Sequence, residues 1–250
     1  MLKFIQKVLI RLGYNLVKFD ELPGDIVEKD FLKYYEKDKQ FTMTGLFRMY
    51  ALYHATKYVI ENDIEGDIVE CGVWKGGSTM LSADMLVEKK LFDRKLYLYD
   101  TYEGMSKPTD KDLYHGFQQK ALKDWESRQT DTHNTWCYSP IEEVKTNLLS
   151  TGYPEEKIEF VKGKVEDTIP GTIPKKISIL HLDTDWYEST YHELIHLFPL
   201  ISKNGVLIID DYGFWQGSRE AVDQYFEEKN IKMLFNRIDY NGRMFVKTED

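Results

Sequence analysis

Residues 66–78 read GDIVECGVWKGGS, and this stretch decides the fold. A short apolar run at Asp67–Cys71 predicts a strand, the glycines after it predict a tight turn, and the stretch from about Gly77 to Lys90 predicts a helix. In such a unit, glycine lets a ligand approach the backbone closely, and the first amides of the helix face that ligand. The segment therefore reads as the opening unit of an α/β ligand-binding fold.

The chemistry of this turn favours a ligand with a cationic group. Its spacing is G-x-x-x-G-G, whereas the dinucleotide fingerprint is G-x-G-x-x-G. Glu70 stands at the end of the strand, before the glycines. A carboxylate there would repel a pyrophosphate and would suit an ammonium or sulfonium group. The turn thus favours S-adenosylmethionine over NAD.

Outward from this unit, strand and helix patterns alternate along the chain. An apolar helical face precedes it, from about Leu46 to Asn62. The further expected strands are Lys95–Asp100, Ile158–Lys162, Ile177–Asp183 and Gly205–Asp210, and the further helices are Ile141–Ser150, Glu188–Leu200 and Ser218–Glu228. Lys232–Phe235 and Arg243–Lys247 should close the chain as an antiparallel pair. The pattern predicts an α/β fold with a doubly wound, mostly parallel sheet and an antiparallel C-terminal strand pair, with its sites at the carboxyl ends of the strands.

A length of 250 residues suits one α/β domain. We expect an N-terminal helical extension over residues 1–40 and the main domain over residues 41–250. Residues 1–19 have apolar positions at helical spacing with basic residues between them, which suits a helix that docks on its own domain, on a second subunit or on a membrane surface. Residues 20–41 show no clean period. Residues 101–140 are polar and aromatic, and a segment of this length suggests a lid or acceptor loop with a helix near Phe117–Arg128.

Composition excludes several classes of protein. The net charge is −9 and no block of lysine and arginine stands out, which argues against nucleic acid as a partner. The two cysteines, Cys71 and Cys137, are too few for a disulfide scaffold. Charged residues interrupt the apolar positions near the start, so neither a signal peptide nor a transmembrane span is expected. These features predict a cytoplasmic protein.

Asp100 ends the second expected strand, KLYLYD. In doubly wound nucleotide-binding folds, an acid at this place binds ribose hydroxyls. Its distance along the chain from Glu70 is about one β-α-β unit, which favours the ribose role. A helix N-cap or an ordinary loop carboxylate is the alternative.

Paired acids follow two consecutive apolar strands. Asp183 and Asp185 lie in LHLDTDWY, and Asp210 and Asp211 lie in LIIDDYG. Because the carboxyl ends of parallel strands meet at one edge of a sheet, four carboxylates should crowd one region, which is unfavourable without a neutralising cation. A hard divalent ion such as Mg²⁺, or Mn²⁺, suits oxygen ligands of this kind. Helix N-caps would explain Asp185 or Asp211 singly but not all four acids.

Taken together, these segments resemble the macrocin O-methyltransferase (TylF-type) family, whose members methylate hydroxyls on deoxysugars of natural products. The matching stretches are GDIVECGVWKGGS, LYDTYEGM, KGKVEDTIP, LHLDTDWYEST and GVLIIDDYG, and the likeness runs from about Phe41 to Val246. The resemblance implies a Rossmann-like class I methyltransferase fold that binds S-adenosylmethionine and Mg²⁺. A homodimer is a further implication.

The resemblance also implies roles for particular residues. Asp183, Asp210 and Asp211 match the metal ligands, and Asp185 matches the proposed general base. The methionine end of the cofactor matches Glu70, Gly72 and Ser78, the ribose matches Asp100, and the turn near adenine matches Gly163 and Glu166. The full expected cofactor-binding set is Glu70, Gly72, Val73, Trp74, Gly76, Ser78, Asp100, Thr101, Gly163 and Glu166.

The function expected on these grounds is transfer of a methyl group from S-adenosylmethionine to a hydroxyl of a sugar or glycosylated natural product. The acceptor would be a small, glycosidic molecule. Three alternatives remain open: a catechol-type O-methyltransferase, a carboxylate-metal hydrolase, and a non-catalytic assembly subunit. Glu70 and the glycine turn argue against the hydrolase, and a non-catalytic subunit would have no need of four clustered acids.

Overall fold

The computed structural model describes residues 5, 8–9, 11–12, 23–116 and 120–249. The amphipathic helix expected over residues 1–19 therefore falls mostly outside the described residues. So does the start of the helix expected from Phe117.

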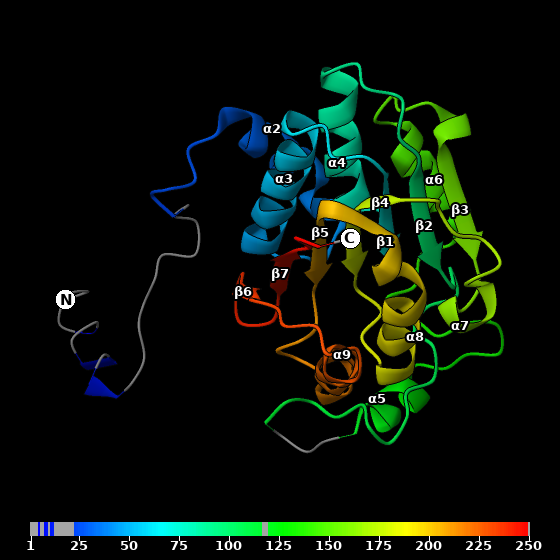
Figure 1. Cartoon of the computed structure of the whole chain (residues 1–250). Coiled ribbons are helices and arrows are strands. Elements are labelled where there is room, and N and C mark those ends of the chain that lie inside the picture. The colour runs from blue at the N-terminus through cyan, green and yellow to red at the C-terminus, as the bar shows by residue number, and fades with distance from the viewer. Residues whose placement is uncertain (1–4, 6–7, 10, 13–22, 117–119, 250) are drawn as a thin grey trace.

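The described part of the chain forms one seven-stranded sheet in the order β3-β2-β1-β4-β5-β7-β6 (Figure 1). The strands are β1 (Asp67–Cys71), β2 (Leu96–Asp100), β3 (Ile158–Lys162), β4 (Ile177–Leu182), β5 (Ile201–Ile209), β6 (Asn236–Arg237) and β7 (Arg243–Val246). The first five strands are parallel, whereas β7 is antiparallel to both β5 and β6. The expected doubly wound sheet with an antiparallel C-terminal pair is confirmed.

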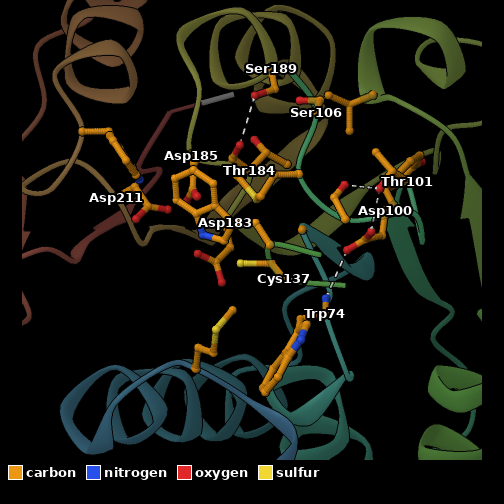
Figure 2. A pocket seen from close by; sticks show the side chains of 18 of the residues that line it. Trp74, Asp100, Thr101, Ser106, Cys137, Asp183, Thr184, Asp185, Ser189 and Asp211 are labelled. Atoms are coloured by element: carbon orange, nitrogen blue, oxygen red, sulfur yellow. Dashed lines mark hydrogen bonds between the residues drawn. The ribbon is translucent and has the colours of Figure 1, made fainter. Parts of the chain in front are cut away.

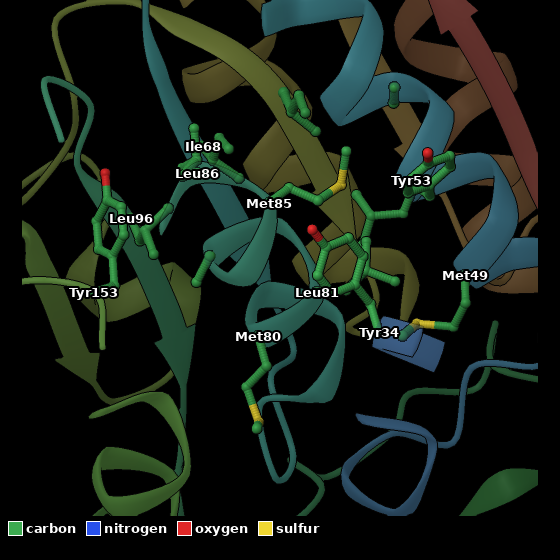
Figure 3. Packing of buried hydrophobic residues seen from close by; sticks show 14 of the residues in the cluster. Tyr34, Met49, Tyr53, Ile68, Met80, Leu81, Met85, Leu86, Leu96 and Tyr153 are labelled. Carbon is green, nitrogen blue, oxygen red and sulfur yellow. The ribbon is translucent and has the colours of Figure 1, made fainter. Parts of the chain in front are cut away.

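Helices cover both faces of the sheet. Beside the sheet lie α2 (Lys29–Asp38), α3 (Leu46–Glu61), α4 (Gly77–Glu88), α5 (Ala121–Ser127), α6 (Ile141–Leu149), α7 (Val165–Thr168), α8 (Tyr187–Leu197) and α9 (Gln216–Glu228), with single 3₁₀ turns at Lys39–Phe41, Glu155–Lys157 and Phe198–Leu200. α2, α3, α4 and α6 share one hydrophobic core with one face of the sheet, whereas α7, α8 and α9 share the other. Figure 3 shows the first core, to which Met80, Leu81 and Leu86 of α4 and Ile68 and Leu96 of the sheet belong.

Alternation of side chains along each strand explains this two-sided packing. Ile68 belongs to the first core and Val69 to the second, and Ile208 and Ile209 divide in the same way. Every residue of β4 is buried, as expected for a central parallel strand that is covered on both faces. Consecutive residues at a strand end therefore point to opposite faces of the sheet.

Two local predictions are corrected. The stretch 20–41 contains α2, although it shows no clean period, because Phe31 and Tyr34 are buried in the core and Leu32 and Tyr35 pack against it among charged residues. The strand expected at Lys232–Phe235 is wrong: the paired residues are Asn236–Arg237, and Phe235 packs instead against the second core. The apolar residues at 232–235 predicted a strand there, but the register with β7 places the paired residues at Asn236 and Arg237.

The long segment 101–140 folds over the carboxyl edge of the sheet. It contains α5, which confirms a helix inside it. Trp186 and Trp215 come from the ends of β4 and β5, and they pack with Ala121, Met105 and Trp136 of this segment. Among the described residues, no helix is both long and apolar enough to cross a membrane.

Candidate active site

A cavity of about 380 Å³ lies at the carboxyl edge of the sheet. Four residues that line the cavity stand at strand ends. Gly72 follows β1, Asp100 is the last residue of β2, and Asp183 and Asp211 come after β4 and β5. Trp136 and Cys137 of the long segment add a further wall. Figure 2 shows Asp100 and Trp74 on one side, Asp183, Asp185 and Asp211 on the other, and Cys137 between them. The cavity therefore has a glycine-turn end and a carboxylate end.

The glycine turn depends on Gly72. Its φ is +84°, and a Cβ there would overlap the carbonyl oxygen of Asp183. Only glycine adopts this conformation freely and permits so close an approach. The Gly72 amide donates to the Tyr99 carbonyl at 2.8 Å, which ties the turn to the neighbouring strand. The turn after β1 is thus built against the loop after β4, which carries the acids.

Asp100 holds this turn in place and also lines the cavity. Its Oδ2 accepts the backbone amides of Val73 at 2.7 Å and Trp74 at 3.1 Å, and its Oδ1 accepts that of Tyr102 at 2.7 Å (Figure 2). Burial raises the pKa of Asp100, although these three amides favour the charged form. The Thr101 hydroxyl also lies 3.4 Å from Oδ1, a long contact that a ligand hydroxyl can replace, because a carboxylate accepts about four hydrogen bonds. Thr101 donates its hydroxyl to the Gly104 carbonyl at 2.6 Å.

The predicted cofactor residues divide into two groups. Those that line the cavity are Gly72, Trp74, Asp100, Thr101, Gly163 and Glu166, whereas Glu70, Val73, Gly76 and Ser78 lie behind it. A Cβ on Gly76 would overlap the Leu148 side chain of α6, so the packing of α6 against the turn explains why this residue is a glycine. Ser78 is buried, and its hydroxyl lies 3.3 Å from that of Thr42. These two residues shape the turn from behind.

Glu70 is buried under the turn and does not reach the cavity. Its carboxylate accepts the hydroxyl of Thr79 and lies 3.4 Å from Nδ1 of His181. Glu70 and His181 are partners in the β1–β4 register, which places them side by side on the same face. The negative charge of Glu70 is therefore shared with a histidine of the neighbouring strand.

Three carboxylates gather at the other end of the cavity. Asp183, Asp185 and Asp211 each offer an oxygen, and these oxygens lie within 4.8 Å of one another. Oδ2 of Asp211 is buried and has no hydrogen-bond partner among the described residues. Burial and repulsion by Asp210 and Asp211 raise the pKa of Asp183 well above its ordinary value, and burial and Asp211 do the same to Asp185. A hard divalent cation fits this oxygen set, because it would neutralise the charges and engage the unpartnered oxygen.

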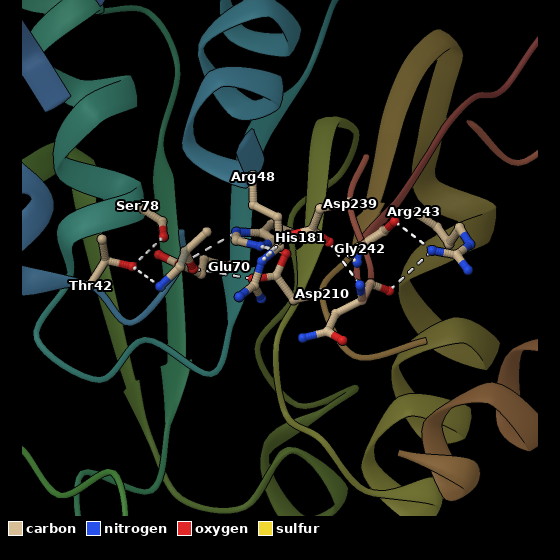
Figure 4. Close-up of polar contacts among 11 residues, drawn as sticks. Thr42, Arg48, Glu70, Ser78, His181, Asp210, Asp239, Gly242 and Arg243 are labelled. Atoms are coloured by element: carbon tan, nitrogen blue, oxygen red, sulfur yellow. Dashed lines mark hydrogen bonds and ion pairs between the residues drawn. The ribbon is translucent and has the colours of Figure 1, made fainter. Parts of the chain in front are cut away.

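Asp210, the neighbour of Asp211, points to the other face of the sheet. It is fully buried and does not line the cavity. Its Oδ2 lies 2.9 Å from an Arg48 nitrogen and 3.2 Å from the Thr44 hydroxyl, and its Oδ1 lies 3.1 Å from Nε2 of His181 (Figure 4). Burial alone would raise the pKa of Asp210, but His181 and Arg48 hold it below its ordinary value. Both oxygens of Asp210 therefore already face positive groups of the chain.

His181 and Arg48 were missed from the sequence. Burial lowers the pKa of His181, but Asp210 and Glu70 together raise it well above its ordinary value. The guanidinium of Arg48 reaches from α3 to Asp210 and also lies 3.3 Å from Asp239. An arginine on an otherwise apolar helix was the available signal for Arg48, and the position of His181 inside LHLD was the signal for the histidine.

The loop after β4 has an unusual backbone. Asp185 has a φ of +70°, which a residue other than glycine rarely adopts. Behind it, the Thr184 hydroxyl donates to the buried Glu193 at 3.1 Å, and the indole of Trp186 donates to the Ser106 carbonyl at 2.9 Å. These anchors force the turn that places Asp183 and Asp185 together in the cavity. Strained residues of this kind concentrate at functional sites.

A family profile described as Macrocin-O-methyltransferase (TylF) matches residues 36–247. Demethyldecarbamoylnovobiocin O-methyltransferase of Streptomyces niveus is 30% identical over 207 residues, which cover 83% of this chain and 76% of that protein. The 8-demethyl-8-(2,3-dimethoxy-alpha-L-rhamnosyl)-tetracenomycin-C 4'-O-methyltransferase of Streptomyces olivaceus is 33% identical over 201 residues, which cover 80% of this chain and 73% of that protein. The solved structure of the O-methyltransferase NovP superposes with a TM-score of 0.73 at 29% identity, covering 84% of this chain and 83% of that one.

Proposed function

The chain belongs to the macrocin O-methyltransferase (TylF) family and is an O-methyltransferase; from this premise we propose that it methylates a hydroxyl of a sugar or glycosylated natural product. The methyl donor is S-adenosylmethionine, and a divalent cation assists at the acceptor. One observation carries the proposal: a single cavity joins the glycine turn and Asp100 at one end to Asp183, Asp185 and Asp211 at the other. Donor and acceptor can therefore meet in one cavity.

The glycine-turn end suits the donor. A volume of about 380 Å³ falls in the range of roughly 300–1,000 Å³ that is usual for small-molecule sites. Asp100 would accept the ribose hydroxyls with the capacity that its three amide donors leave. Gly163 and Glu166 line the cavity after β3 and would lie beside the adenine. Glu70 would act at the methionine end through the backbone of the turn, since its carboxylate stays behind the cavity wall.

The carboxylate end suits the acceptor. Asp183 and Asp211 would hold the cation, and Asp185 would remove the proton from the acceptor hydroxyl. When bound, S-adenosylmethionine supplies an electrophilic methyl group, and the cation lowers the pKa of a hydroxyl that contacts it. The remaining work of the chain is to hold the acceptor oxygen in line with the methyl group and to exclude water. Trp136 and Trp215, which line the cavity, would supply the water-excluding wall.

The role of Asp210 as a third cation ligand stays a prediction. Arg48 and Thr44 contact its Oδ2, whereas its Oδ1 lies 3.1 Å from Nε2 of His181. Asp210, His181 and Asp183 also offer ligand atoms that lie within 4.8 Å of one another, so Asp210 would join the cation site through Oδ1. In its present position it acts as the anchor that fixes α3 against the sheet.

The names of the relatives support a sugar acceptor. The S. olivaceus protein is named for 4'-O-methylation of a rhamnosylated tetracenomycin. A catechol acceptor would instead present two adjacent aromatic hydroxyls, and an acceptor screen separates the two. A homodimer and a cytoplasmic location are further parts of the proposal; sizing by light scattering and fractionation of cells test them.

Calorimetric titration of S-adenosylmethionine into the protein, with Mg²⁺ and then with chelator, tests the donor site. We expect micromolar binding, weakened at least tenfold by Asp100→Asn because ribose hydroxyls and turn amides both depend on that carboxylate. Asp93→Asn, which removes an exposed carboxylate, is the control and should leave the affinity unchanged. Absence of binding to the unaltered protein under both conditions would refute the donor assignment.

A further inference from the structure

Three arginines gather outside the carboxylate end of the cavity. The guanidinium carbons of Arg219 and Arg243 lie 5.5 and 5.0 Å from the centre of the Tyr212 ring. That of Arg237 lies 5.7 Å from the centre of the Tyr240 ring. Arg219, Arg237 and Arg243, with these two tyrosines, form what is called here the arginine patch. It brings together the first turn of α9 and the hairpin of β6 and β7.

The arrangement of these charges is unfavourable by itself. Arg237 and Arg243 are direct partners in the antiparallel β6–β7 register. Like charges directly opposite one another on a strand pair destabilise it. Partial burial and the nearby Arg237 and Arg219 lower the pKa of Arg243, and they outweigh the opposite effects of Tyr212 and Asp239. On a chain whose net charge is −9, such a concentration of positive charge needs a reason.

Two carboxylates, Asp223 and Asp239, lie near the patch, but neither forms an ion pair with Arg237 or Arg243. Asp223 lies 3.4 Å from Arg219 and accepts the Tyr212 hydroxyl at 2.7 Å. Asp239 lies in the hairpin turn, where its Oδ1 accepts the Gly242 amide at 2.7 Å and its Oδ2 lies 3.3 Å from Arg48 (Figure 4). In the part of the chain that is described, neither Arg237 nor Arg243 forms an ion pair, and their hydrogen bonds go to backbone carbonyls. Asp239 acts on Arg243 only from beyond ion-pair distance, so both guanidinium groups can still take an anionic partner.

The patch adjoins the acceptor end of the cavity. Tyr212 directly follows Asp211, and Gly213 donates its amide to the Asn241 carbonyl at 2.9 Å. Asn241 lines the cavity, and its carbonyl also lies 3.4 Å from a guanidinium nitrogen of Arg243. An acceptor that enters the cavity can thus extend over this turn onto the patch.

We propose that the arginine patch binds the diphosphate group of an acceptor whose sugar is linked to a diphosphate carrier. This inference rests on the proposed function and names the class of its substrate. The planar guanidinium fork matches phosphate oxygens, and two or more forks suit a group with several negative charges. The acids inside the cavity repel an anion, so the sugar hydroxyl enters and the diphosphate stays outside. The carrier is a nucleoside or a lipid, since both present the same diphosphate.

The test is calorimetric titration with inorganic pyrophosphate in buffer free of divalent cations, so that no metal at the carboxylates binds the probe. The variant is Arg237→Gln with Arg243→Gln. The control is Lys203→Gln, an exposed residue near the amino end of β5 that also loses positive charge. We expect the double variant to bind pyrophosphate at least tenfold more weakly and the control to bind it as the unaltered protein does.

Two further measurements complete the test. UDP and farnesyl diphosphate replace pyrophosphate to identify the carrier: tighter binding of the first assigns a nucleoside, and tighter binding of the second assigns a lipid. S-adenosylmethionine affinity should be the same in the variant and the unaltered protein, because the donor end is separate. The proposal is refuted if the double variant and the unaltered protein bind pyrophosphate equally well. It is also refuted if the unaltered protein does not bind pyrophosphate at millimolar concentration. If the unaltered protein does not bind S-adenosylmethionine, that result refutes the proposed function and not the assignment of the arginine patch.

Discussion

Replacing Arg48 by methionine tests whether a buried ion pair fixes α3 against the sheet. Asp210 is fully buried, the Arg48 side chain is only 15% exposed, and the two approach to 2.9 Å. Methionine keeps much of the apolar stem of arginine but removes the charge. Removing one partner of a buried pair costs about 3–5 kcal/mol, because the other charge remains buried. His181, at 3.1 Å, still faces Asp210, so the lower end of that range is expected.

Thermal and urea denaturation in the presence of chelator measure this cost. For a chain of this size, each kcal/mol lowers Tm by roughly 2–4 °C, so Arg48→Met should lower it by roughly 6–12 °C. The matched control is Arg219→Met, which breaks an exposed pair with Asp223. Such a pair contributes about 1 kcal/mol or less. Arg48→Met should therefore cost at least about three times as much as the control.

A double-mutant cycle shows whether the loss comes from the pair itself. Arg48→Met combined with Asp210→Asn removes both charges, so the double variant should be more stable than the sum of the single changes implies, by about 1–3 kcal/mol. Mg²⁺ should also raise the Tm of Arg48→Met more than that of the unaltered protein, because a cation can replace the lost positive charge. A cost equal to that of the Arg219 control, together with strict additivity in the cycle, would refute the reasoning.

Three other predictions address the site and the fold. Asp185→Asn should lower kcat by about 10²–10⁴-fold with S-adenosylmethionine affinity unchanged; near-normal kcat at saturating acceptor would exclude it as the base. Gly72→Ala should destabilise the fold by at least about 2 kcal/mol and weaken cofactor binding, since its Cβ would overlap the Asp183 carbonyl; an unchanged Tm would contradict this. Burial and the nearby Asp84 raise the pKa of Asp38 to about 8. The unfolded value is about 3.9, so the stability that protonated Asp38 contributes is full below pH 4 and is lost as the pH rises to 8; Asp38→Asn should flatten that slope in urea denaturation, and an unaltered slope would refute it.

Local sequence patterns predicted most of the fold. Short apolar runs marked the five parallel strands, and the glycines after Cys71 marked the turn that opens the cavity. These features could be read because each depends on residues that are close in the chain. The rule that parallel strands end at a common edge then predicted that Asp183, Asp185, Asp210 and Asp211 would lie close together.

Contacts between residues far apart in the sequence could not be predicted from local patterns. Arg48 and Asp210 lie 162 residues apart, and nothing local announces their pairing. α2 was not recognised because its two core residues stand among charges, and β6 was misplaced because its register comes from β7. Neither Arg237 nor Arg243 has a distinctive neighbourhood in sequence, so their direct opposition became visible only in the folded hairpin.

Asp210 and Asp211 show which features of the site the sequence predicts and which depend on the tertiary structure. The sequence by itself determined that both acids end the same apolar strand, and it determined that they would lie near Asp183. Only the fold decided that Asp211 enters the cavity while Asp210 turns to Arg48 and His181. The reason is that successive side chains of a strand point to opposite faces of the sheet, and what covers each face is set by helices distant in the sequence.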